Sequence, residues 1–181
     1  SRIGPPACVG WQHLGDAALE FYFVGAIAPD RRPSSALKAT VAACKAAEAS
    51  RVAWTVADTT GYLRDELGVA LKLAKIKHLR PVHVLAIGDD PHLGPVLSPW
   101  TSDDQVTVHR IPKPPAARSK PSGRRAGWRQ ESFARWLTGA NLRWLHPSDM
   151  IFANEPAEQL FGGSPELADQ LKGLLVGFSD D

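Results

Sequence analysis

The sequence predicts an α/β fold in which a parallel sheet is flanked by helices and followed by the start of a small β-rich module. Short apolar segments alternate with segments of helical periodicity, and Gly, Asp and Pro separate them. This strand–helix alternation favours right-handed crossovers and parallel strands. The 181 residues, 44% apolar and 22% charged, suffice for a folded domain with its own core.

The first half of the chain predicts two strands with a helix between them. Residues 19–24 read as a strand, and a helix is expected over 36–49, because Ser34 and Ser35 can cap its start. Residues 52–57 are nearly all apolar, as in a parallel strand that is buried on both faces.

The second half continues the alternation. Apolar residues at helical spacing predict a helix over 66–79, and strands are expected at 82–87 and 106–111. Residues 112–123 hold four prolines, which predicts a mobile loop. A further helix is expected over 124–137.

After that helix the pattern changes to short apolar stretches separated by Gly and Pro. Residues 142–145, 150–152 and 174–178 are candidate strands of the β-rich module. The predicted division is therefore one domain over 1–139 and the start of a second, truncated module over 140–181.

Charge is unevenly distributed, although the net charge is only +2. Residues 110–143 carry nine Lys and Arg and one acid, whereas residues 145–181 carry seven acids and one Lys. The basic segment suggests an anionic partner such as a phosphate, a nucleotide or a nucleic acid. A solvated helix face with a flexible basic loop is the alternative.

Several classes of protein are disfavoured. No apolar run approaches the roughly 18 residues of a membrane span, so no membrane partner is expected. The cysteines Cys8 and Cys44 form no CxxC pair, the six histidines form no close ligand pair, and there is no Gly-x-Ser-x-Gly elbow. We expect no secretory signal, a reducing cytoplasmic location and, without an initial Met, a fragment or a processed chain.

The first candidate site is the segment Asp58-Thr59-Thr60-Gly61, which follows the apolar run. Ligands bind beyond the carboxyl ends of parallel strands. There a carboxylate can hold magnesium or its waters, hydroxyls can position phosphate oxygens, and Gly lets backbone amides approach. An Asx turn that opens a helix is the structural alternative.

GTPases also carry Asp-x-x-Gly at such a position. The chain has neither an Asn/Thr-Lys-x-Asp motif nor a Gly-x-x-x-x-Gly-Lys-Ser/Thr phosphate loop. Either the phosphate loop precedes Ser1, or the protein is not an NTPase.

The second candidate site is the arginine pair Arg125 and Arg129. Four residues apart in a helix, their guanidinium groups project from one face and can grip a transferring phosphate. The Pro- and Gly-rich segment ahead of them would let the helix swing as a lid. A surface helix with solvated arginines is again the alternative.

Five segments taken in order resemble the polynucleotide 5′-hydroxyl kinase family, whose members act in tRNA splicing, mRNA 3′-end formation and pre-rRNA processing. They are residues 1–6, 23–29, 56–62, 71–81 and 125–129. The resemblance covers most of residues 1–139 and implies a P-loop NTPase-like parallel sheet.

The resemblance also assigns site residues. Thr59-Thr60-Gly61-Tyr62 matches the family's Thr-x-Gly-Trp clasp, with Tyr in place of Trp, and Arg125 with Arg129 matches its Arg-x-x-x-Arg lid. Tyr62 would stack on the terminal base, and Thr59 with Gly61 would hold the terminal phosphodiester.

The two lid arginines would hold the γ-phosphate, and Asp58 would touch a magnesium-bound water. The family's Walker A lysine and Walker B segment would both precede Ser1, so this part alone would be inactive.

The implied function is ATP- and Mg²⁺-dependent phosphorylation of the 5′-hydroxyl end of RNA or DNA. The alternatives are a non-catalytic nucleotide- or RNA-binding adaptor of the same fold and another P-loop NTPase of the GTPase-like kind.

Overall fold

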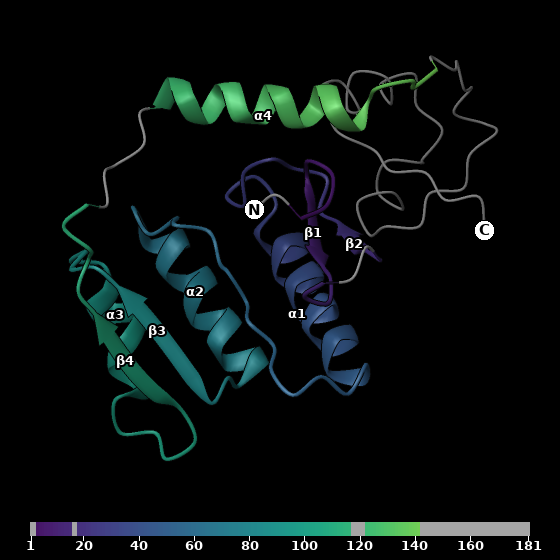
Figure 1. Ribbon diagram of the computed structural model, residues 1–181. Coiled ribbons are helices and arrows are strands. Elements are labelled where there is room, and N and C mark those ends of the chain that lie inside the picture. Colours follow the sequence, from purple (N-terminus) through teal and green to yellow (C-terminus); the bar gives the residue numbers. More distant parts are fainter. Residues whose placement is uncertain (1–2, 16–17, 117–121, 142–181) are drawn as a thin grey trace, which may run out of the picture.

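The computed structural model describes residues 3–15, 18–116 and 122–141 (Figure 1). In chain order its elements are β1 (Cys8–Trp11), β2 (Glu20–Phe23), α1 (Pro33–Ala49), α2 (Glu66–Leu79), β3 (His83–Ile87), α3 (Leu93–Leu97), the 3₁₀ turn η1 (Ser98–Trp100), β4 (Thr107–Ile111) and α4 (Ser122–Trp136).

A parallel sheet is present, as predicted, and consists of β3 and β4. His83 pairs with Thr107 and Ile87 pairs with Ile111. The crossover contains α3, and one face of the sheet packs on α2 and α3 through Ala86. The chain is therefore a mixed α/β fold with a parallel sheet and flanking helices.

The strand predicted over 19–24 forms as β2, but it is not part of the parallel sheet. It pairs antiparallel with β1, a strand that the sequence pattern did not predict. At the end of this hairpin the Trp11 indole donates a 3.1 Å hydrogen bond to the Glu20 carboxylate across the two strands. Apolar periodicity identifies a strand, but it does not identify the strand's partner.

The strand predicted over 52–57 is wrong. This segment forms no strand, and the side chains of Trp54 and Val56 are 79% and 87% exposed. Figure 1 shows the segment as part of the connection that runs beside α2 to reach its start. An apolar run becomes a strand only when a neighbouring strand supplies hydrogen bonds, and among the described residues β3 and β4 pair with each other instead.

Helix α1 begins at Pro33, earlier than predicted, and the expected serine cap is wrong. Arg32 occupies the N-cap position without a side-chain cap hydrogen bond. Proline suits the first helical turn because its fixed φ is helical and its missing N–H would have no partner there.

Alanines form the buried face of α1, and this face packs on the β1–β2 hairpin and on α2. The buried alanines are Ala36, Ala39, Ala43 and Ala47. Methyl side chains let these elements approach closely, so larger residues on this stripe would separate α1 from α2.

Helix α2 has the predicted bounds. Asp65 caps its N-terminus, and Arg80 ends it in the left-handed conformation with φ of 44°. Pro81 follows and prevents continuation of the helix. The capping carboxylate becomes important for the candidate site described below.

The outer face of the β3–β4 sheet is uncovered among the described residues. Leu85 and Ile87 of β3 are 59% and 64% exposed. His83 and His109 lie on the same face, with ring nitrogens 3.1 Å apart. This proximity was not expected from the sequence, because the two residues come from different strands.

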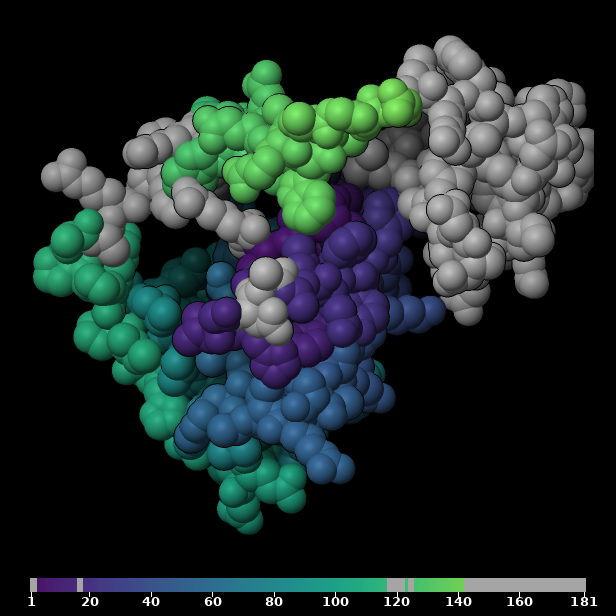
Figure 2. Space-filling model, turned by 45° about the vertical axis from the view of Figure 1, so that its right-hand side comes forward, coloured from purple at the N-terminus to yellow at the C-terminus, as the bar shows by residue number. Residues whose placement is uncertain are grey.

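Helix α4 begins at Ser122, two residues before the predicted start, and ends at Trp136. The Trp136 ring packs edge-on against Phe21 of β2, with centroids 6.3 Å apart. Figure 2 shows α4 lying against the purple N-terminal hairpin. The candidate strands at 142–145, 150–152 and 174–178 lie outside the described residues, as does part of the predicted mobile loop.

The two cysteines, Cys8 and Cys44, are free and half-buried. Burial raises the pKa of both thiols. In the described part of the chain, no helix is long and apolar enough to cross a membrane.

Candidate functional site

The segment 58–62 lies against helix α2, and Lys72 holds it there. The Lys72 ammonium donates to the Thr59 hydroxyl, with Nζ and Oγ1 2.5 Å apart, and to the Thr60 backbone carbonyl. Thr59 and Gly61 are both predicted to bind substrate. They lie on either side of Thr60, whose carbonyl is bonded to α2.

Tyr62 is fixed to the start of the same helix. Its hydroxyl donates to both carboxylate oxygens of Asp65, at 2.7 and 2.6 Å. Asp65 also accepts a 2.9 Å hydrogen bond from the Gly68 amide and so caps α2. These bonds lower the pKa of Asp65, with the Tyr62 hydrogen bond as the largest cause, and they raise the pKa of Tyr62 to about 12.

A glycine in the first turn of α2 permits this arrangement. A Cβ atom at Gly68 would lie 3.1 Å from both the Leu63 Cα and the Tyr62 carbonyl oxygen. Both are backbone atoms, so they could not move aside cheaply. The Tyr62–Leu63 backbone can therefore approach α2 only because residue 68 has no side chain.

Lys72 is an unusual anchor because part of its side chain is buried. Burial lowers the pKa of its ammonium to about 8; the charge of Lys75 adds to this shift and that of Asp58 opposes it. Lys75, one turn further along α2, is buried and has a lowered pKa for the same reason. No described carboxylate lies within ion-pair distance of Lys72.

Asp58 does not lie at the end of a strand, contrary to the prediction from the sequence. It is exposed and follows an irregular segment, so the premise of an Asp-x-x-Gly motif at a strand end is wrong. The Asx cap that opens the helix is Asp65 rather than Asp58. Within the described ranges, no group of three or more His, Cys, Asp or Glu could hold a metal ion.

The two predicted lid arginines lie in α4. Arg129 is exposed and makes no hydrogen bond or ion pair with another described residue, Glu131 included. Figure 1 shows α4 crossing over the end of the molecule at which α2 begins. In this view the helix of the lid motif passes above the end of α2 that carries the clasp, and Arg129 makes no hydrogen bond with a described residue of the clasp.

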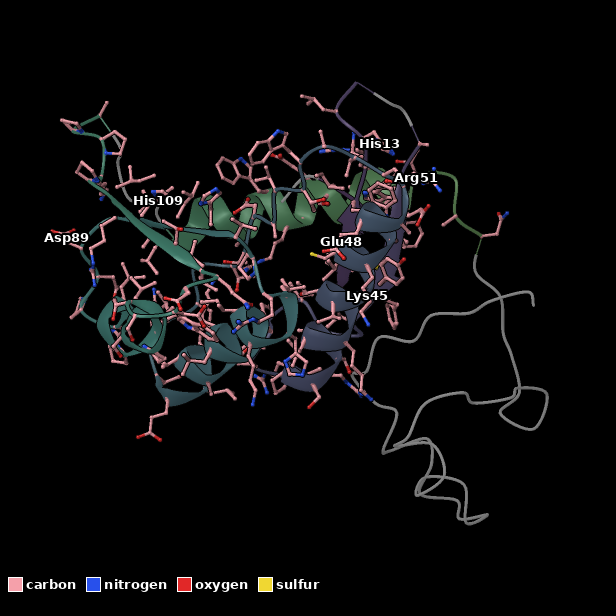
Figure 3. The ribbon with its side chains drawn as sticks, turned by 90° about the horizontal axis from the view of Figure 1, so that it is seen from below. His13, Lys45, Glu48, Arg51, Asp89 and His109 are labelled. Carbon is pink, nitrogen blue, oxygen red and sulfur yellow. The ribbon has the colours of Figure 1, made fainter. Side chains whose placement is uncertain are left out.

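One predicted strand-end loop does follow a parallel strand, namely the loop after β3. Asp90 accepts a hydrogen bond from the His92 amide at 2.9 Å, and its carboxylate lies 3.0 Å from the His92 ring nitrogen Nδ1. These contacts lower the pKa of Asp90. Figure 3 shows Asp89 and His109 on the sheet side of the molecule, away from Lys45 and Glu48 of α1. The Asp90 carboxylate is therefore already bonded to its neighbour His92.

Three residues of the site were not identified from the sequence: Asp65, Gly68 and Lys72. The helical spacing of the sequence gives a signal for Lys72 only. Gly68, Leu71 and Lys75 form the buried face of α2, and Lys72 borders that face. Lysines on the buried side of a helix are unusual and indicate a specific partner.

Taken together, the site combines an aromatic ring, a hydroxyl and a backbone amide in the segment that precedes α2, and the Lys72 ammonium of α2 holds that segment. Hydroxyl and amide donors bind phosphate oxygens, and an aromatic face binds a base. This combination suits the end of a nucleic-acid strand.

Comparison with known families gives one match, to the mRNA cleavage and polyadenylation factor CLP1 P-loop, over residues 1–139. The match confirms the resemblance to polynucleotide kinases, and it includes the clasp segment and both lid arginines. Comparisons with curated proteins and with solved structures gave no match. Because the match spans most of the chain, this protein belongs to the CLP1 P-loop family.

Proposed function

We propose that this chain forms the substrate-binding part of an ATP- and Mg²⁺-dependent polynucleotide 5′-hydroxyl kinase. The observation that carries the proposal is the clasp, in which Thr59, Gly61 and Tyr62 are held on α2 by Lys72 and Asp65. The family match supports it, because the family is a P-loop family related to polynucleotide kinases.

The substrate is the 5′-hydroxyl end of RNA or DNA. Its own hydroxyl is the nucleophile, so the protein needs to supply positioning and charge stabilisation only. The Tyr62 ring stacks on the terminal base, while the Thr59 hydroxyl and the Gly61 amide donate to the terminal phosphodiester. The open space around Gly61 supports this role, since no heavy atom lies within 4 Å of where its Cβ would be.

The lid arginines act on the phosphate that is transferred. Arg125 and Arg129 lie on one face of α4, and the exposed guanidinium of Arg129 has no described partner to compete for it. Planar guanidinium groups stabilise the charge that spreads over the γ-phosphate oxygens in the transition state.

The donor set of the described residues does not by itself make a magnesium site, because Asp58 is a single exposed carboxylate without neighbouring ligands. We propose that ATP and Mg²⁺ are held by a phosphate loop of the kind that the family match implies. When bound, ATP supplies the phosphoryl group that the 5′-hydroxyl accepts.

The test is phosphate transfer by the protein made from its complete coding sequence. Labelled γ-phosphate from ATP should appear on a short 5′-hydroxyl oligonucleotide and should not appear on the same oligonucleotide with a 5′-phosphate. Tight oligonucleotide binding without transfer would instead indicate a non-catalytic adaptor. Hydrolysis of GTP without transfer to the oligonucleotide would indicate an NTPase of the GTPase-like kind.

A further inference from the structure

Lys72 occupies a position that the proposed reaction does not by itself explain. It lies in the middle of α2, a helix that packs on both α1 and α3, so its backbone is rigidly placed. Its ammonium uses two of its three protons on Thr59 and Thr60, which are 13 and 12 residues away along the chain. These bonds attach the first two residues of the clasp to α2.

The contact with Thr59 fixes what the Thr59 hydroxyl can do. A hydroxyl has one proton to donate and two lone pairs that accept. Because Lys72 donates to Oγ1, one lone pair is occupied by a charged donor, and the hydroxyl proton remains free for an acceptor elsewhere. Thr59 is thereby prepared to donate to an anion rather than to accept from a neighbour.

The contact with Thr60 fixes the next peptide group. The peptide between Thr60 and Gly61 is planar and trans, so its C=O and N–H bonds point in opposite directions. Because the carbonyl is turned toward Lys72, the Gly61 amide is turned away from it. The space around Gly61 is open, and a ligand can approach this amide.

We propose that Lys72 is a positioning residue of the substrate site: it holds the Thr59 hydroxyl and the Gly61 amide as a pair of donors for the terminal phosphodiester of the oligonucleotide. The inference rests on the proposed function for the identity of the ligand. It assigns Lys72 an indirect role, in which the ammonium orients the two donors and does not itself bind the phosphate.

The cost of placing a charge at this position supports the inference. Burial disfavours the charged form of Lys72, as its lowered pKa shows, and no described carboxylate pairs with it. A solvated lysine would avoid this penalty by extending into water, as the exposed Lys77 of the same helix does. The hydrogen bonds to Thr59 and Thr60 are the described interactions that offset part of it.

The experiment compares Lys72→Met and Lys72→Arg with wild type, and Lys77→Met is the matched control on the same helix. The affinity for a short 5′-hydroxyl oligonucleotide is measured by fluorescence anisotropy over a series of salt concentrations, with the protein from the complete coding sequence. Nuclear magnetic resonance order parameters of the residue 59–61 amides are measured without oligonucleotide.

We expect Lys72→Met to weaken oligonucleotide binding by about tenfold, since two charge-assisted hydrogen bonds that preorganise the clasp are lost. The slope of log affinity against log salt should stay as in wild type, because a residue that does not touch phosphate releases no counterion. The order parameters at residues 59–61 should fall, Lys72→Arg should recover part of both effects, and Lys77→Met should change neither.

A salt slope reduced by about 0.7 would overturn the proposal, because it would show direct phosphate contact by Lys72. Unchanged affinity and unchanged order parameters in Lys72→Met would overturn it as well. If wild type does not bind the oligonucleotide, the proposed function fails. In that case the order parameters still decide whether Lys72 holds the clasp.

Discussion

The Tyr62 hydroxyl donates to both oxygens of the Asp65 carboxylate, the group that caps helix α2. One carboxylate therefore fixes the tyrosine and the start of the helix together. The ring that we propose to stack on the terminal base is held at its far end, which limits its rotation. Preorganised aromatic groups lose less entropy when they bind a ligand.

Substitution of Tyr62 tests its stacking role. Tyr62→Ala should weaken oligonucleotide affinity by roughly 5- to 150-fold, because the aromatic contact with one base is lost. Tyr62→Trp should preserve affinity, and Tyr62→Phe should stay near wild type while lowering the melting temperature through loss of the Asp65 hydrogen bond. Titration with ATP is the control and should hardly change. Equal losses for ATP and oligonucleotide in Tyr62→Ala would show that Tyr62 only packs.

The lid arginines predict a loss of rate without a loss of stability. Arg125→Ala or Arg129→Ala should lower kcat by at least about 100-fold, since each guanidinium stabilises charge that develops on the γ-phosphate. The double variant should lose less than the product of the two single losses, because the pair acts as a unit.

Arg→Lys at either position should rescue the rate only in part. Arg135→Ala, an exposed arginine in the last turn of the same helix, is the matched control. Kinase rate and melting temperature are measured for each variant. Rates within about threefold of wild type for Arg125→Ala and Arg129→Ala would mean that the arginines form a solvated helix face.

The lowered pKa of Asp65 predicts that the protein loses stability in acid. Its pKa in the folded state lies below the ordinary value of 3.8, first because of the Tyr62 hydrogen bond and then because of the Gly68 amide. The folded state therefore binds fewer protons, and the stabilisation is present above pH 3.8 and is lost as the pH falls through the lowered value. Melting temperatures of wild type and Asp65→Asn should differ at neutral pH and converge in acid. A constant difference would contradict this assignment.

Lys72 predicts a dependence of the same sign at alkaline pH. Its pKa falls from 10.5 in the unfolded chain to about 8 in the folded one. Between these values the folded state binds fewer protons, so the contribution of Lys72 to stability rises with pH. The melting temperature of wild type relative to Lys72→Met should therefore increase from about pH 8 to pH 10.5. A flat difference would show that the amine is solvated, and a falling difference would show that the folded state raises its pKa; either would contradict the prediction.

Gly68 predicts a steric effect. Gly68→Ala should lower the melting temperature, because the new methyl group would meet the Tyr62–Leu63 backbone at 3.1 Å. This clash should outweigh the gain in helix propensity, which is about 1 kcal/mol. Gly127→Ala in α4 is the control, since no atom lies within 4 Å there and the same gain should raise stability. If Gly68→Ala is as stable as wild type, the close packing of the clasp on α2 is not maintained in solution.

Local interactions explain what the sequence predicted correctly about the fold. Helix α2 has the predicted bounds because its apolar spacing and the stop at Pro81 are features of neighbouring residues. Strands β3 and β4 were predicted to within one residue at their starts, since short apolar runs between turn residues indicate buried strands. The clasp and lid residues were identifiable as motifs, and the family match over 1–139 includes them.

Only the tertiary structure decided which segments pair and which side chains meet. The apolar run 52–57 stays irregular and β2 pairs antiparallel with β1, because a strand is completed by hydrogen bonds to another segment that its own composition does not specify. The same reason applies to the site. Lys72 and Thr59 are 13 residues apart, and they meet beside the place where Gly68, which has no side chain, lets the Tyr62–Leu63 backbone lie against the helix. Such a contact depends on the path of the backbone in space, which no local pattern encodes.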